Sequence, residues 1–177
     1  MKTVLAIALS LALPAAAAKE EMEVRNQGAV KAHVWTSTAG LESARVQLRA
    51  LTALSNDVTA WDPHQARALL RGARDDIQLA RTHARSLEAM RGKQAGEDLR
   101  KLDGDLAGAL ALVDKLQEPI ARGVSPKSAD RSQRGGTPEV QQLRAGIKAA
   151  WERLEQAKGD LDKVARAYET TTRLPEP

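Results

Sequence analysis

Cysteine and phenylalanine are both absent from this sequence of 177 residues, and its aromatic side chains are limited to three tryptophans and one tyrosine. The absence of cysteine excludes disulfides, thiolate nucleophiles, cysteine-based zinc sites and covalently attached c-type haem. The sequence also lacks a Gly-rich phosphate loop and the G-x-S-x-G and H-E-x-x-H motifs of common hydrolases. We therefore expect a protein that is not an enzyme and that requires no cofactor.

A strong net charge is lacking as well, because 27 Lys and Arg residues are offset by 23 Asp and Glu residues. The formal charge of +4 is small for a dedicated nucleic-acid-binding domain. The aromatic residues do not alternate with basic ones, as they do in single-strand binding grooves. We expect no nucleic-acid partner.

The sequence has no apolar run of the roughly 20 residues that a membrane-spanning helix needs. Its longest apolar run lies in the opening MKTVLAIALSLALPAAAAKEE, where Lys2 precedes Val4–Leu13 and Pro14. This order, completed by small residues, is typical of a secretory signal peptide. We predict removal of residues 1–18 by cleavage after Ala18, and a periplasmic or secreted protein without a transmembrane anchor. An uncleaved anchor is the alternative, and we expect any helix here to end at Pro14.

Four later segments carry apolar residues at alternating spacings of three and four, which predicts helices with one buried stripe each. We place these helices at about 26–55, 63–91, 95–122 and 138–170, in one domain of residues 19–177, although the first helix could begin near Asn26 or only near Ser37. The stripes consist of Val30, Val34, Ser37, Leu41, Ala44, Leu48 and Leu51; Ala66, Leu70, Ala73, Ile77, Ala80, Ala84 and Leu87; Leu99, Leu102, Leu106, Ala109, Val113, Leu116 and Ile120; and Val140, Leu143, Ile147, Ala150, Leu154, Ala157, Leu161, Val164 and Tyr168.

Capping signals mark several ends of these helices. Asp62 followed by Pro63, and Thr137 followed by Pro138, are typical of helix starts, because the side-chain oxygen accepts a free backbone N–H and proline needs no donor. Gly92 and Gly123 are expected to end the second and third helices.

The short connections between helices favour antiparallel neighbours, so we predict an all-α, up-down-up-down four-helix bundle with a heptad-like Ala/Leu core. Residues 123–137 are expected to form a mobile polar linker. The many alanines let helix axes approach closely and leave little volume for a cofactor. The alternative is a pair of long hairpins that dimerise as a coiled coil.

Two histidines are candidate metal ligands. If the first hairpin turns near residue 58, His33 and His83 lie at the same height beside one helix seam, since each directly precedes a core position. Two imidazoles could hold a metal ion weakly, or haem in a four-helix carrier, but a structural metal normally needs four ligands. The alternative is two surface histidines beside a seam.

An arginine stripe follows the core spacing of the second helix one residue later. Arginine binds carboxylates and phosphates through two parallel hydrogen bonds, so the stripe could bind an anionic partner. Alternatively, Asp103 and Asp114 on the third helix could pair with it inside the bundle. The stripe consists of Arg67, Arg71, Arg74, Arg81 and Arg85.

Trp35 and Trp151 lie at the edges of the first and fourth stripes. Each is either a partly buried cover of the core or an anchor for a partner, because tryptophan is enriched in binding hot spots. The two could also cover one seam together.

These features favour a non-enzymatic, exported helical-bundle protein that binds an envelope partner through surface helix faces. The partner would be a protein or an anionic lipid or glycan. One alternative is a metal- or haem-binding carrier that uses His33 and His83. The other is a structural protein that forms homo-oligomers through its heptads.

Overall fold

The computed structural model is built from four α-helices. It describes residues 3–57, 59–91, 95–126, 137–170 and 172, with side chains from residue 26 onward except that of Arg91. Within these ranges there is no strand, so the predicted all-α class is confirmed. The helices are α1 (Thr3–Asn56), α2 (Pro63–Arg91), α3 (Gly96–Ala121) and α4 (Pro138–Ala167).

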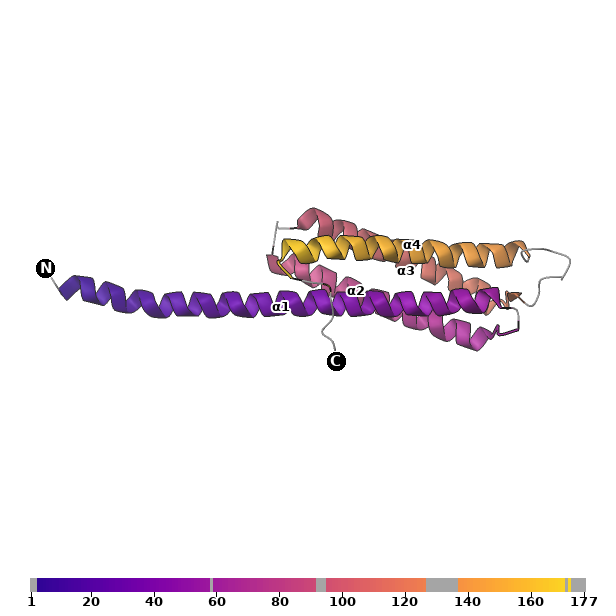
Figure 1. Ribbon diagram of the computed structural model, residues 1–177, viewed down its shortest axis with the longest axis horizontal. Helices are drawn as coiled ribbons and strands as arrows, with labels where there is room; N and C mark the ends of the chain where they lie inside the picture. Colours follow the sequence, from indigo (N-terminus) through magenta and orange to yellow (C-terminus); the bar gives the residue numbers. More distant parts are fainter. Residues whose placement is uncertain (1–2, 58, 92–94, 127–136, 171, 173–177) are drawn as a thin grey trace.

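The helices lie side by side as a bundle in which α1 and α3 each contact both α2 and α4 (Figure 1). Across α2 and α3, Arg74 pairs with Asp114 and Arg85 with Asp103, so residue numbers rise on one helix as they fall on the other. The polar contacts between α1 and α2 and between α1 and α4 follow the same antiparallel order. The arrangement is consistent with the predicted four-helix bundle.

Every position of the four predicted stripes is buried. The eight alanines among them are at most 2% exposed, and they allow the helices to approach closely. Where α1 crosses α2 the backbones approach closely, because a β-carbon at Gly40 would lie 2.7 Å from the carbonyl oxygen of Asp76. The hydroxyl of Ser37 donates to the carbonyl of Ala80 at 3.1 Å in the same seam.

The caps predicted at the starts of α2 and α4 are present. Asp62 accepts the N–H of His64 at 2.8 Å at the start of α2, and Thr137 accepts the N–H of Val140 at 3.4 Å at the start of α4. Gly123 follows the end of α3 with a φ of +84°, a conformation that glycine adopts without strain. Gly92 and residues 127–136 of the predicted linker lie outside the described residues.

α1 begins at Thr3, before either start suggested by the sequence, and it continues through Pro14 (Figure 1). The expectation that a helix ends at Pro14 is therefore wrong. Proline removes one backbone hydrogen bond at a cost of about 3 kcal/mol, and the leucines and alanines around it are strong helix formers. The side chains of the predicted signal peptide lie outside the described part of the chain. None of the described helices combines the length and the apolarity that crossing a membrane requires.

Candidate functional site

The α2 flank, defined as Arg67, Arg71, Arg74, Arg81 and Arg85, faces α3 over part of its length. Arg74 Nε lies 2.9 Å from Asp114, and Asp103 accepts hydrogen bonds from both Arg81 and Arg85. The structure thus brings three of the five arginines against the two acidic residues that the sequence offered as internal partners. Within the part of the chain that it describes, Arg67 and Arg71 make no ion pair.

Asp103 is held firmly in its ionised form by these contacts. The hydrogen bond from Arg81 and then that from Arg85 lower the pKa of Asp103 to about 2, although burial acts in the opposite direction. The carboxylate is therefore charged at any neutral pH, and it offsets positive charge on the α2 flank. This part of the flank stabilises the bundle and has less charge to offer a partner.

His33 and His83 meet across the α1–α2 seam. They lie at the same height along the bundle, as the sequence predicts. Their Nδ1 atoms are 2.7 Å apart, so one imidazole donates a hydrogen bond to the other, and the ring centres are 4.9 Å apart. Among the described residues, no group of three or more His, Cys, Asp or Glu side chains could hold a metal ion. The histidines therefore provide two ligands at most.

The histidine pair should make the bundle less stable in mild acid. Burial, followed by the nearby charge of His83, lowers the pKa of His33 below its ordinary value of 6.5. The unfolded chain then binds more protons than the folded one just below pH 6.5, so stability falls as the pH drops through this value. The hydrogen bond between the two rings also needs an unprotonated Nδ1 as its acceptor, and it contributes about 1 kcal/mol.

Urea unfolding at about pH 7.5 and about pH 5 measures this effect, because these two pH values lie on either side of the ordinary titration range of histidine. His33→Gln should reduce the difference in free energy between the two pH values by about 1 kcal/mol. His64, which is exposed, provides the matched control through His64→Gln. A difference that His33→Gln leaves unchanged would contradict this role of the pair.

The two candidate tryptophans lie apart and do not cover one seam together. The amino group of Lys31, on the same helix, lies 4.6 Å from the ring centre of Trp35. Trp151 on α4 instead faces α1, where the guanidinium groups of Arg45 and Arg49 lie 5.1 and 5.4 Å from its ring centre. Trp151 is half-buried, and two cations contact its ring where one contacts that of Trp35.

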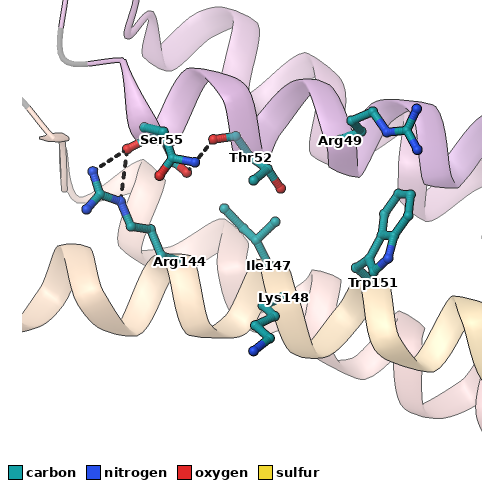
Figure 2. Close-up of a pocket in the computed structure, with 8 residues that line it drawn as sticks. Arg49, Thr52, Ser55, Arg144, Ile147, Lys148 and Trp151 are labelled. Carbon is teal, nitrogen blue, oxygen red and sulfur yellow. Dashed lines mark hydrogen bonds between the residues drawn. The ribbon is translucent and has the colours of Figure 1, made fainter.

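A hollow of about 380 Å³ opens between α1 and α4 beside Trp151 (Figure 2). Ile147 points into it from α4, between the ring of Trp151 on one side and a bridge from Arg144 to Ser55 on the other. The lining, all within the described residues, includes three cations and no acidic side chain. We call this site the α1–α4 hollow; it is lined by Arg49, Thr52, Ser55, Asn56, Arg144, Ile147, Lys148 and Trp151.

The bridge at one end of the hollow follows from the chemistry of a helix terminus. The last carbonyl groups of a helix have no partner within it and carry partial negative charge, which favours a cation there. Arg144 Nε and Nη2 donate to the carbonyl of Ser55 at 3.0 and 2.7 Å, in the last turn of α1. Arg144 thereby joins the end of α1 to α4 and keeps the two sides of the hollow in place.

The cations of the hollow could not be grouped from the sequence. Arg49, Arg144 and Lys148 lie on helices that are joined through α2 and α3, so their proximity depends on the α1–α4 register. The available signal was Trp151, a large aromatic residue beside the core stripe. The sequence also offered no reason to single out Arg45, whose guanidinium forms ion pairs with Glu42 and Glu155.

Comparison of the chain with protein-family models, with curated proteins and with solved structures finds no match.

Proposed function

We propose that this chain is an exported, non-enzymatic four-helix bundle of up-down-up-down order that binds an anionic partner of the bacterial envelope. The partner would be a protein surface or an anionic lipid or glycan. Export is supported by the basic start, short apolar run and small residues that precede Lys19. The bundle contributes exposed helix faces on which a partner can bind.

The observation that carries this proposal is the difference in charge pairing between two faces. On the α2 flank, Asp103 and Asp114 offset three of the five arginines. The α1–α4 hollow instead has three cations and no carboxylate among its described lining residues. Trp151 lies at the same place, and a half-buried tryptophan beside cations is a common composition of a binding hot spot.

Binding to vesicles of mixed phosphatidylglycerol and phosphatidylcholine, compared with phosphatidylcholine alone, tests the proposal. Arg49→Glu combined with Lys148→Glu should weaken binding to the anionic vesicles by about tenfold or more, because both side chains are exposed cations of the hollow. Lys101→Glu combined with Lys115→Glu makes the same change of charge on α3, and should reduce binding far less.

Equal losses in the two double variants would show that only net charge matters, and would contradict a specific face. If wild-type protein binds neither anionic vesicles nor any anionic component captured from the native envelope, the proposed function is wrong. Mass spectrometry of the exported protein tests the first part of the proposal, with a chain that begins at Lys19 as the expected result.

A metal carrier is the second candidate, and the contact between His33 and His83 favours it. Two ligands that are each about 2.0 Å from a metal ion, at an angle of 90°, lie about 2.8 Å apart. The observed 2.7 Å between the Nδ1 atoms is close to this value, whereas the opposite axial ligands of haem iron would be about 4 Å apart. The pair therefore suits a small metal ion, such as Cu²⁺ or Ni²⁺, better than haem.

Thermal unfolding with added Cu²⁺, Ni²⁺ or Zn²⁺ tests the metal candidate, since an ion that binds the folded protein raises its melting temperature. The increase should disappear in His83→Gln and remain in His64→Gln. An unchanged melting temperature with all three ions would exclude this function.

A further inference from the structure

The α1–α4 hollow has an apolar floor and a cationic rim. Ile147, which is only 1% exposed, forms the floor, and the ring of Trp151 forms a wall beside it (Figure 2). The lining surface is mainly apolar. Its volume of about 380 Å³ is at the lower end of the range of small-molecule sites.

Three cations line the edge of this apolar surface, and they differ in the contacts that they already make within the protein. Arg144 is bonded to the end of α1, and it serves to hold the site open. Among the described residues, Lys148 pairs with Glu152 through a long, exposed contact of 3.8 Å, which contributes little energy. Arg49 is exposed and lies over Trp151. Arg49 is thus the group best placed to bind an anion, whereas the amino group of Lys148 points away from α1 and reaches the hollow by a change of rotamer (Figure 2).

The hydroxyl groups of the hollow are committed to the backbone. Thr52 donates to the carbonyl of Leu48 at 2.9 Å, and Ser55 donates to the carbonyl of Thr52 at 2.8 Å. These two hydroxyls have no hydrogen left to donate and can only accept, which leaves fewer of the directed hydrogen bonds that a sugar needs from its site. The hollow is therefore better matched to a ligand with one charged group and an apolar body.

We infer that the α1–α4 hollow binds a free, small amphiphilic carboxylate, with its charged group at Arg49, within reach of the flexible Lys148, and its chain over Ile147 and Trp151. This inference rests on the proposed function and names the ligand chemistry of its site. The apolar chain adds to the affinity because it moves out of water and onto Ile147 and the indole face of Trp151. The carboxylate contributes through charge-assisted hydrogen bonds, which are stronger than neutral ones.

Calorimetric titration with three probes separates the two contributions. Decanoate carries both the charge and the chain, decanol carries the chain alone, and acetate carries the charge alone. Decanoate, kept below its micelle concentration, should bind one molecule per chain, with decanol and acetate each weaker by about tenfold or more. Decanol that binds as tightly as decanoate, or decanoate that does not bind, would overturn the inference.

Variants locate the site on the protein. Arg49→Glu with Lys148→Glu, and separately Trp151→Leu, should each weaken decanoate binding by about tenfold. Lys101→Glu with Lys115→Glu should leave it unchanged, and circular dichroism should show that all variants keep their helices. Decanoate binding that survives both changes in the hollow would overturn the inference.

The vesicle and decanoate experiments distinguish the inference from the function on which it rests. Binding of anionic vesicles without binding of decanoate overturns the small-ligand inference and leaves the proposed function standing. Binding of decanoate, lost in the hollow variants, supports the inference even where no vesicle or envelope component binds, and the proposed envelope partner is then wrong.

Discussion

Replacing Gly40 by leucine should lower the free energy of unfolding by about 3 kcal/mol, an amount typical of severe overpacking. Gly40 lies in the interior of α1 where this helix crosses α2. A β-carbon there would lie 2.7 Å from the carbonyl oxygen of Asp76 and 3.3 Å from the side chain of Ala80. Because one of these neighbours is backbone, the helices must move apart to admit any side chain.

Leucine is a useful replacement because it forms helices better than glycine by about 0.8 kcal/mol, so a loss of stability reports packing alone. Gly28 is the matched control on the same helix, since a β-carbon there has nothing within 4 Å. Gly28→Leu should leave stability unchanged or raise it by up to about 0.8 kcal/mol. Chemical denaturation of both variants measures the difference, and equal stabilities would refute the close α1–α2 contact.

Asp103→Asn should lower the free energy of unfolding at neutral pH by about 1.5 kcal/mol. A carboxyl whose pKa is lowered from 3.8 to about 2 contributes roughly 2 kcal/mol, and solvent screening of a side chain that is 28% exposed reduces this amount. Asparagine keeps the shape of the side chain but cannot form ion pairs with Arg81 and Arg85. The expected loss therefore reports charge and not volume.

The pH dependence of this loss has a defined direction. Because the folded pKa is the lower one, the contribution of Asp103 is fully present above the unfolded pKa of 3.8 and is lost as the pH falls toward 2. Wild type and Asp103→Asn should thus converge in stability between about pH 4 and pH 2. Asp75→Asn is the control, since Asp75 is 73% exposed and 4.0 Å from Arg74. A gap between wild type and Asp103→Asn that stays constant with pH would contradict the ion pairs.

Much of the fold could be predicted because each helix carries its own signals. The spacing of apolar residues identified every buried stripe position, and Asp62 and Thr137 marked helix starts by a local mechanism. The expectation at Pro14 failed because a single proline weakens a helix without having to end it, while the residues around it favour the helical state.

The candidate sites differ in whether their residue contacts could be predicted from the sequence. The short hairpin between α1 and α2 fixes the height of His33 relative to His83, so their contact could be predicted from the turn. The α1–α4 hollow depends on a register between the first and last helices, and a shift of one residue would turn Arg49 away from Trp151. Local spacing contains no information about that register.

An NMR titration with a monomeric, short-chain phosphatidylglycerol tests most directly the claim that anions bind the α1–α4 face. The three tryptophan indole N–H groups serve as probes, with Trp35 and Trp61 lying outside the hollow. We predict that the indole signal of Trp151 moves in a saturable way together with the backbone signals of Lys148. If the signals of Arg67 and Arg71 on the α2 flank move while that of Trp151 stays in place, the assignment of the binding face is wrong.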